Sequence, residues 1–235
     1  MKIALLGYGK MGKEIELVAS SRNHTIVSKI DKNFKEGDLN LADIAIDFSS
    51  PDAALSNIIM ALNINIPVVS GTTGWLKDFN MVESASKKNN VGFLYSSNFS
   101  IAVNIFLELN RSLAKLLEKH NEYSIELNET HHDQKIDAPS GTAISIANDI
   151  ISNSRYEKWS LNVNEKNSLH INSIRKGNII GIHEVNYKSS GDQIKISHES
   201  FSRSNYAIGA LIASEWLIGK KGIYSMSDVL NINKK

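Results

Sequence analysis

Residues 129–143 offer most of the chemistry that the sequence contains. They read Glu-Thr-His-His-Asp-Gln-Lys-Ile-Asp-Ala-Pro-Ser-Gly-Thr-Ala and include His131, His132, Lys135, Ser140, Gly141 and Thr142. A histidine is a competent proton donor near neutral pH, and a lysine can pair with a carboxylate or a developing negative charge. The Ser-Gly-Thr run follows a proline where a helix should begin, so its amides can bind an anion. The segment predicts a small anionic substrate that is held and protonated.

Each of these residues also has an ordinary structural explanation. Ser140 can cap a helix, Lys135 can be solvated, and the two histidines can bond to their neighbours. We favour the chemical interpretation because all of them fall in one segment. No metal site is predicted, because no third histidine or carboxylate stands at a familiar spacing and adjacent strand side chains diverge. Ser140 is not predicted to be a nucleophile, because Ala-Pro-Ser-Gly is not the Gly-x-Ser-x-Gly elbow.

A second motif opens the chain, between a predicted strand and a predicted helix. It consists of Gly7, Tyr8, Gly9, Lys10, Met11 and Gly12. In a dinucleotide site the first glycine permits the tight turn, the second lets the pyrophosphate approach the backbone, and the third lets the helix pack on the strand. Asp31 ends the second predicted strand, at a distance suited to the ribose hydroxyls. The alternative is a glycine-rich turn with Asp31 as a simple turn residue.

Two polar segments follow later strands of the same predicted sheet. They are Gly71, Thr72, Thr73 and Gly74, and then Ser96, Ser97, Asn98 and Phe99. Ligands of open parallel sheets lie at the carboxyl ends of the strands. We therefore expect both segments to face the same crevice as Gly9 and to meet the ribose and the nicotinamide amide, although each alone is commonly an ordinary turn.

The elements that position these motifs change in character near residue 100. Strands are predicted at 2–6, 25–30, 43–48, 66–70 and 91–96, alternating with helices at 10–20, 52–62 and 75–88. This alternation predicts a parallel sheet covered on both faces. The first domain is expected at 1–100, with 207–235 packing back on it.

The second domain is expected at 101–206 and is predicted to bind substrate and to form the oligomer. A long amphipathic helix is predicted at 102–120, with Phe106, Leu109, Leu113, Leu116 and Leu117 on its apolar side. A strand at 123–128 and a helix at 142–151 come next. Strands at 168–175, 179–187 and 193–197 are joined by turns at 176–178 and 189–192, both typical of hairpins. A last helix is predicted at 206–217. The fold class is thus α/β, a Rossmann-type parallel sheet followed by an α+β unit on a mixed sheet.

Composition excludes several classes of function. The 235 residues carry a formal net charge of +1, so nothing draws the chain toward nucleic acid or an acidic membrane. There are no cysteines, which excludes disulfides and thiolate metal sites. No apolar window is long enough to span a bilayer, and no signal peptide is recognisable. We therefore expect a cytoplasmic protein.

The sequence 129–143 closely resembles the signature of the dihydrodipicolinate reductase family, the 4-hydroxy-tetrahydrodipicolinate reductases of bacterial lysine and diaminopimelate synthesis. The resemblance spans nearly the whole chain, through Asp47-Phe48-Ser49, Gly71-Thr72-Thr73-Gly74, Asn98-Phe99-Ser100, Val103-Asn104, Arg175-x-Gly177, Gly181-x-His183, His198, Ser202-Arg203, Gly209-Ala210 and Trp216-Leu217-x-Gly219-Lys220. The reaction segment is highly specific to this family, whereas the glycine motif is not.

The resemblance implies a homotetramer assembled through the sheet of the substrate domain. It implies an enzyme that reduces the hydroxylated tetrahydrodipicolinate with NADH or NADPH, with loss of water. His131 would be the proton donor or acceptor and Lys135 a further donor, while His132, Gly141 and Thr142 would bind the substrate carboxylates, with Ser140 beside them. Residues 7–12, 31, 71–73 and 96–99 would line the cofactor.

Departures from the family pattern bear on charge. Lys32 stands after Asp31 where arginine is commoner, and a lysine is a point charge rather than a fork. Asp31 should bond the ribose hydroxyls of NADH and repel the 2′-phosphate of NADPH, which Lys32 attracts, so we expect use of both with a lean to NADH. Asp133 and Gln134 stand where basic or aromatic residues are commoner, which adds a negative charge near the anion site.

Two other kinds of protein remain as alternatives. One is a different small NAD(P)-dependent oxidoreductase on the same two-domain plan, and the other is a nucleotide-binding sensor without catalysis. The reaction segment argues against both, because a sensor needs no proton donor beside an anion pocket. A third alternative, an assembly protein, predicts exposed apolar strands and no ligand.

Overall fold

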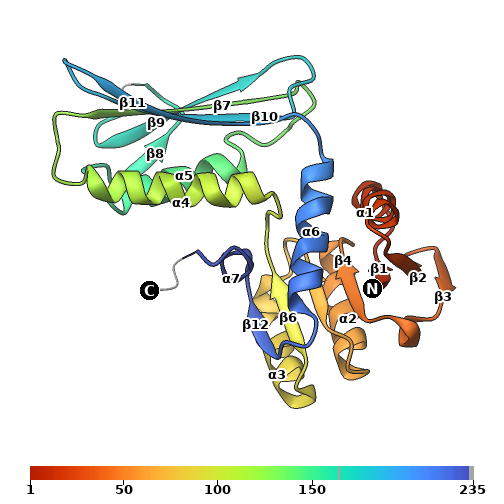
Figure 1. Ribbon diagram of the computed structural model, residues 1–235. Coiled ribbons are helices and arrows are strands. Elements are labelled where there is room, and N and C mark those ends of the chain that lie inside the picture. The colour runs from red at the N-terminus through yellow and green to blue at the C-terminus, as the bar shows by residue number, and fades with distance from the viewer. Residues whose placement is uncertain (164, 233–235) are drawn as a thin grey trace. The chain divides into compact units, whose positions relative to one another are not determined.

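Both ends of the sequence contribute to the first of two units in this computed structural model, which describes residues 1–163 and 165–232. The first unit contains Met1–Ile101 and Ser204–Lys235, and the second contains Ala102–Arg203 (Figure 1). Each is described by itself. No helix among the described residues is long and apolar enough to cross a membrane.

The first unit is a seven-stranded sheet with helices on both faces. Its strands are β1 (Lys2–Leu6), β2 (Thr25–Asp31), β3 (Phe34–Gly37), β4 (Ile44–Asp47), β5 (Val68–Ser70), β6 (Gly92–Tyr95) and β12 (Gly222–Tyr224). Its helices are α1 (Lys10–Ser21), α2 (Pro51–Asn63), α3 (Phe79–Asn89), α6 (Ser204–Leu217) and α7 (Met226–Val229), with 3-10 turns at Leu39–Leu41 and Leu76–Asp78. The strand order is β12-β6-β5-β4-β1-β2-β3.

Alternation along each strand supplies two separate apolar cores. In β1, Ile3 and Leu5 pack with α1, α6 and α7, while Ala4 and Leu6 pack on the opposite face with α2 and α3. Successive strand residues point to opposite faces, so a continuous apolar run is what a sheet buried on both faces requires. The predicted α/β fold with a Rossmann-type sheet is confirmed.

The sequence pattern did not predict some elements of the first unit. β3 is an exposed edge strand that pairs antiparallel with β2, and β12 adds a parallel strand beside β6. Both are short and lack the buried apolar run that identified the other strands. The helix predicted at 75–88 is a 3-10 turn at Leu76–Asp78 followed by α3.

The second unit is a five-stranded mixed sheet with two helices on one face. Its strands are β7 (Ser124–His131), β8 (Lys158–Ser160), β9 (Ser168–Arg175), β10 (Gly181–Lys188) and β11 (Gln193–Ser200), in the order β11-β10-β7-β9-β8. Its helices are α4 (Ile101–Leu116) and α5 (Gly141–Ile151), which lie side by side under the sheet in Figure 1. The core of this unit joins Leu127, Ile171, Val185 and Tyr187 of the strands to Phe106 and Ile146 of the helices.

The predicted hairpin at 176–178 is wrong. β9 and β10 do not pair with each other, because β7 lies between them, parallel to β9 and antiparallel to β10. The connection therefore crosses the end of β7, where the Lys176 amide donates to the His131 carbonyl at 2.8 Å. The turn at 189–192 does close a hairpin, since Lys188 of β10 pairs with Gln193 of β11.

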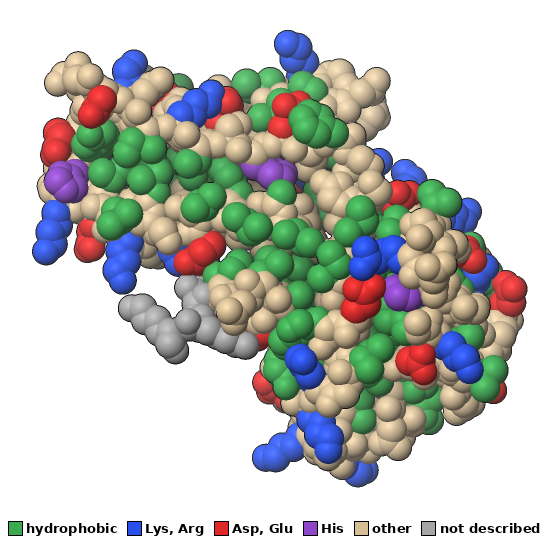
Figure 2. Space-filling model, in the orientation of Figure 1, with side chains coloured by type: hydrophobic (Ala, Val, Ile, Leu, Met, Phe, Trp, Pro, Cys, Tyr) green, Lys and Arg blue, Asp and Glu red, His purple; other side chains and the backbone are tan. Residues whose placement is uncertain are grey.

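The orientation of α4 differs from its predicted apolar stripe. Phe106, Leu113 and Leu117 do join the core, but Leu109 and Leu116 are 55% and 76% exposed. The buried side of the helix carries Asn110, whose amide donates to the Ile146 carbonyl of α5 at 3.2 Å. The contact between α4 and α5 thus shifts the buried face of α4 around the helix axis from the predicted one. Hydrophobic side chains gather on the surface of the second unit in Figure 2.

Candidate active site

A groove runs along the carboxyl edge of the first sheet. Its two parts share Gly9, Phe48 and Ser49, and the larger part has a volume of about 650 Å³. Of the residues predicted to bind a cofactor, those that line it are Gly7, Gly9, Lys10, Met11, Asp31, Lys32, Gly71, Thr72 and Thr73. They come from the ends of β1, β2 and β5 and the start of α1. The sheet thus brings these separate motifs to one edge, as expected for parallel strands.

The glycine loop has the shape that a diphosphate needs. Gly7 has a φ of +95°, and a Cβ there would lie 2.3 Å from the Phe48 carbonyl oxygen. A Cβ on Gly12 would lie 2.4 Å from the Gly7 carbonyl oxygen, so α1 packs directly on the loop. A Cβ on Gly9 would meet nothing within 4 Å. No side chain caps the start of α1, so its first amides are left for an anion.

Asp31 ties the glycine loop to the end of β2. One carboxylate oxygen accepts from the Tyr8 amide at 2.5 Å and the other from the Lys32 amide at 2.7 Å. Each oxygen keeps a further lone pair for a ribose hydroxyl. The Tyr8 side chain donates to Glu16 and lies under Lys29, whose Nζ is 4.7 Å from the ring centroid. Tyr8 and Gly12 are not among the residues that line the groove.

The residues 96–99 form a tight turn after β6. Ser96 Oγ donates to the Asn98 carbonyl at 2.7 Å, and Asn98 accepts from the Ser100 amide at 2.9 Å. Phe99 is 1% exposed and packs on Phe48, with ring centroids 5.7 Å apart. None of the residues 96–99 lines the groove, although Phe48 does.

Asp47, at the end of β4, supports the floor of this groove. It is fully buried and accepts from Ser49 Oγ at 2.6 Å and from Ser70 Oγ at 2.8 Å. Burial raises its pKa, while these hydroxyl donors act in the opposite direction. Ser49 also donates its amide to Thr72 Oγ1 at 2.9 Å, so the segments after β4 and β5 are held together.

In the second unit, strand register assembles a polar row across four strands. His198 of β11 pairs with His183 of β10, His183 with Glu129 of β7, and Glu129 with Ser173 of β9. Glu129 and His131 lie two and four residues beyond Leu127, on the same buried face of β7. The face that packs apolar side chains against the helices thus becomes polar at one end.

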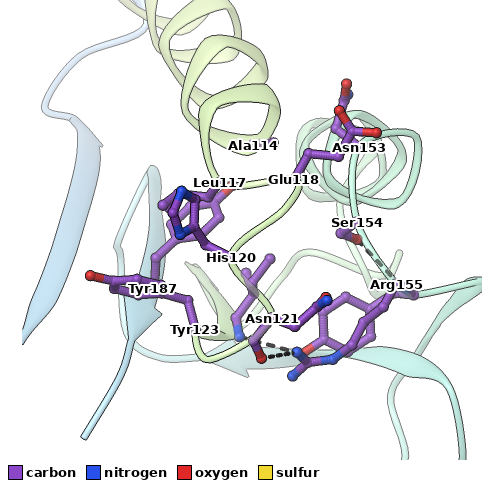
Figure 3. Close-up of a pocket in the computed structure, with 12 residues that line it drawn as sticks. Ala114, Leu117, Glu118, His120, Asn121, Tyr123, Asn153, Ser154, Arg155 and Tyr187 are labelled. Carbon is purple, nitrogen blue, oxygen red and sulfur yellow. Dashed lines mark hydrogen bonds between the residues drawn. The ribbon is translucent and has the colours of Figure 1, made fainter. Parts of the chain in front are cut away.

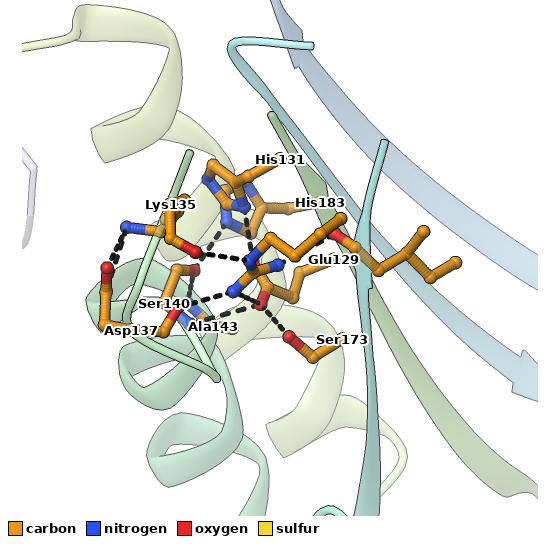
Figure 4. Close-up of polar contacts among 10 residues, drawn as sticks. Glu129, His131, Lys135, Asp137, Ser140, Ala143, Ser173 and His183 are labelled. Carbon is orange, nitrogen blue, oxygen red and sulfur yellow. Dashed lines mark hydrogen bonds and ion pairs between the residues drawn. The ribbon is translucent and has the colours of Figure 1, made fainter. Parts of the chain in front are cut away.

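The Glu129 carboxylate is the centre of this cluster (Figure 4). It is fully buried, and Oε2 lies 2.5 Å from His131 Nδ1. Oε1 accepts from Ser173 Oγ, from Arg175 Nη2 at 3.0 Å and from the Ser140 amide at 3.3 Å. Burial alone would raise the pKa of Glu129, but the bonds from His131, Ser173 and Arg175 lower it well below its usual range.

Lys135 lies in the loop between β7 and α5. Its ammonium group lies 2.8 and 2.9 Å from the two carboxylate oxygens of Asp137. This contact lowers the pKa of Asp137. Asp137 is exposed, and an exposed pair is worth about 0–1 kcal/mol, so an incoming substrate carboxylate can compete for the lysine. Arg175 fixes the loop itself by donating to the carbonyl oxygens of Lys135 and Asp137.

Ser140 caps α5, as the structural alternative expected, and also joins the cluster. Its Oγ accepts from the Ala143 amide at 3.2 Å and lies 3.2 Å from His183 Nε2. The amides of Gly141 and Thr142 in the first turn are then left for a ligand or water. Burial, with the nearby His131 acting in the same direction, lowers the pKa of His183 to about 4, so this imidazole is neutral at pH 7.

His132 and Asp133 lie just beyond β7. The His132 side chain is partly exposed, whereas that of His131 is buried. The Asp133 carboxylate accepts from the Gly177 amide at 3.0 Å, and the Asp133 amide donates back to the Gly177 carbonyl. The extra negative charge in this loop is therefore bonded to the turn after β9.

Several residues of these clusters could not be recognised as site members from their spacing in the sequence. Glu129, Ser173, Arg175, His183 and His198 meet only because of strand register, and Asp47, Phe48 and Ser49 because β4 lies between β1 and β5. Glu129, Arg175, His183, His198 and the Asp47-Phe48-Ser49 run do belong to the family-like pattern. That pattern was the only signal that marked them.

Ligand atoms of Glu129, His131 and His183 lie within 4.8 Å of one another, as in a metal site. Arg175 already compensates the carboxylate, so we interpret the group as a proton site.

A separate cavity near Tyr187 and Arg155 has a volume of about 20 Å³, room for about one water molecule (Figure 3).

Comparison with known proteins identifies the family of the chain. The family model described as dihydrodipicolinate reductase, N-terminus, matches residues 1–99, and that described as dihydrodipicolinate reductase, C-terminus, matches residues 102–230. A 4-hydroxy-tetrahydrodipicolinate reductase of Christiangramia forsetii is 46% identical over 234 residues, covering 98% of each chain. One from Clostridium novyi is 37% identical and covers 97% of this chain and 98% of its own.

Solved structures show the same fold. A dipicolinate-bound dihydrodipicolinate reductase from Paenisporosarcina sp. TG-14 has a TM-score of 0.79 at 23% identity, covering 97% of this chain and 98% of its own. A probable dehydrogenase from Thermotoga maritima has a TM-score of 0.57 at 11% identity, covering 99% of this chain and 93% of its own. The chain therefore belongs to the dihydrodipicolinate reductase family and catalyses that family's reaction, the NAD(P)H-dependent reduction of 4-hydroxy-tetrahydrodipicolinate in the diaminopimelate route to lysine.

Proposed function

We propose that His131 exchanges a proton with the substrate and that Lys135 is a second donor in the same reaction. The observation that carries this proposal is the cluster on β7. A buried histidine is bonded to a carboxylate, and the loop bearing a cation is tied to the same carboxylate through Arg175. One carboxylate thus connects a histidine, the loop of a cation and a helix N-terminus.

The substrate is proposed to be a small dicarboxylate. The relative from Paenisporosarcina binds dipicolinate, a planar dicarboxylate. In this chain the start of α5 supplies amides at Gly141 and Thr142 and the hydroxyl of Thr142, while His132 adds a further donor. Ser140 is proposed to orient this turn, because its hydroxyl is already engaged by Ala143 and His183.

The groove of the first unit is proposed to hold the nicotinamide cofactor. The open space at Gly9 and the uncapped start of α1 fit a diphosphate. Asp31 fits the adenine-ribose hydroxyls, and Lys32 beside it fits the 2′-phosphate of NADPH. The turn 96–99 is proposed to approach the nicotinamide. When bound, the cofactor supplies the hydride. Because Asp31 repels and Lys32 attracts the phosphate, we propose use of both cofactors with a lean to NADH.

A homotetramer in the cytoplasm completes the proposal. α4 and α5 cover one face of the second sheet. The opposite face carries Ile174, which is 39% exposed, in one row with Ile182. That face is the proposed contact between copies of the chain. Light scattering coupled to size exclusion measures the mass in solution, and a monomer would contradict the assembly.

The catalytic roles are tested by replacing His131 and Lys135 singly with Ala. Substrate is generated with the preceding synthase, and loss of NAD(P)H absorbance is followed. Each variant should lower kcat by about 10²–10⁴-fold with little change in NADH affinity, because both groups act at the reacting centre. His120→Ala and Lys119→Ala are matched controls on exposed positions. Full turnover in His131→Ala and Lys135→Ala would reject the assignment.

A further inference from the structure

The two carboxylate oxygens of Glu129 have different partners. Oε1 faces donors only, namely Ser173 Oγ, Arg175 Nη2 and the Ser140 amide. Oε2 has no partner among the described residues apart from His131 Nδ1, which in turn has none apart from Oε2. Because the carboxylate can only accept, the short contact between these two atoms requires a proton on Nδ1.

The other nitrogen of His131 faces a different environment. A Cβ added to Gly181 of β10 would lie 3.0 Å from His131 Nε2. Glycine at this position therefore avoids the crowding of Nε2 that a side chain on residue 181 would cause. With Nδ1 protonated against Glu129, Nε2 of the neutral ring carries the lone pair that can accept a proton.

Glu129 is itself held from three directions. Arg175, which pairs with it, also donates to the carbonyl oxygens of Ile174, Lys135 and Asp137. The Ser140 amide fixes the carboxylate to the start of α5. A carboxylate restrained by a guanidinium, a hydroxyl and an amide can hold an imidazole in one orientation, as second-layer partners of histidines do elsewhere.

We propose that Glu129, restrained by Arg175, is a positioning residue that holds His131 in the Nδ1–H form, so that Nε2 is the atom that exchanges a proton with the substrate. This inference rests on the proposed role of His131. It identifies Glu129 as the residue that determines which ring nitrogen of His131 exchanges the proton. The same carboxylate links His131, the Lys135 loop and the start of α5, so the orientations of all three are set together.

Glu129→Gln tests this inference directly, because only one orientation of the glutamine side-chain amide satisfies its neighbours. Three donors surround the Oε1 position, so the amide oxygen must face them and the NH2 group must face His131 Nδ1. The NH2 group donates to Nδ1, which moves the ring proton to Nε2. The imidazolium form also loses the acceptor for its Nδ1 proton. The variant therefore reverses the tautomer while nearly conserving the shape of the side chain.

Nitrogen-15 spectra of histidine-labelled protein report the tautomer directly. The His131 signals, assigned by their loss in His131→Ala, should show the Nδ1–H form in the native chain and the Nε2–H form in Glu129→Gln. The kcat of Glu129→Gln should fall by roughly 10²-fold, with NADH affinity unchanged. Glu126→Gln, on an exposed position of the same strand, is the matched control and should change neither readout.

Two further variants separate this inference from the proposed function. Adding Glu129→Gln to His131→Ala should cost no more activity, because Glu129 acts through the histidine. Gly181→Ala should lower kcat and keep the Nδ1–H form, which tests Nε2 even if Glu129→Gln does not fold. Loss of activity in His131→Ala alongside an Nε2–H ring in the native chain would overturn the positioning role alone. Full activity in His131→Ala would overturn the proposed function.

Discussion

Ser140 Oγ lies 3.2 Å from His183 Nε2, and this contact joins the start of α5 to β10. His183 is 4% exposed, and its pKa of about 4 means that it stays neutral in the folded protein at pH 7. A histidine that is neutral when folded but protonated when unfolded makes stability depend on pH.

His183→Gln should therefore flatten the pH dependence of stability. Between about pH 6.5 and 4 the unfolded chain binds a proton at this histidine that the folded chain does not, so folding free energy is lost as pH falls. From pH 7 to pH 5 this single group accounts for about 1–2 kcal/mol. Urea unfolding at both pH values should show a smaller difference for His183→Gln than for the native chain. An unchanged difference, matching the exposed control His120→Gln, would contradict the lowered pKa.

Alanine at Gly9 and at Gly12 should have opposite effects. A Cβ at Gly9 meets nothing within 4 Å, so Gly9→Ala should fold normally but weaken NADH binding by filling the space proposed for the diphosphate. A Cβ at Gly12 would lie 2.4 Å from the Gly7 carbonyl oxygen, so Gly12→Ala should cost about 1–3 kcal/mol of stability. Thermal melting and NADH titration by fluorescence measure the two effects. Native NADH affinity in Gly9→Ala would move the diphosphate elsewhere.

Thr142→Val tests the anion pocket at the start of α5. The change removes a hydroxyl and nearly keeps the shape of the side chain. Inhibition by pyridine-2,6-dicarboxylate should weaken by about 1–3 kcal/mol if the hydroxyl donates to a carboxylate. Ser152→Ala at the opposite end of the helix is the control. Equal inhibition of Thr142→Val and the native chain would place the pocket elsewhere.

Lys32→Ala tests whether Lys32 recognises the 2′-phosphate of NADPH. Lys32 is exposed, so its pairing with the 2′-phosphate of NADPH is worth about 0–1 kcal/mol and is screened by salt. KM for NADPH should rise several-fold in Lys32→Ala, while KM for NADH stays nearly unchanged, and the contrast should shrink at high salt. Lys35→Ala on β3 controls for the general loss of a charge. An equal response of the two cofactors would show that Lys32 does not distinguish them.

Local patterns in the sequence were enough for the first sheet and the motifs at its edge. Apolar runs such as Lys2–Leu6 identify strands buried on both faces, and the glycines between β1 and α1 have one familiar use. The carboxyl ends of parallel strands share an edge, so the meeting of Gly9, Asp31 and Thr72 at one groove follows from topology. The short edge strands β3 and β12 carry no such run and were missed.

Long-range pairing decided the rest of the site. His131 was recognised from its neighbours in the sequence, but Ser173, Arg175 and His183 reach Glu129 only because β7 enters the sheet between β9 and β10. The turn at 176–178 looks local, and its residues cannot reveal that a strand from 45 or more residues earlier lies between its two arms. Local propensity reports on a few consecutive residues, whereas strand register is fixed by burying the whole apolar face of the sheet. The sequence by itself therefore determined the family and marked the residues proposed to react, and the tertiary structure determined which carboxylate contacts His131.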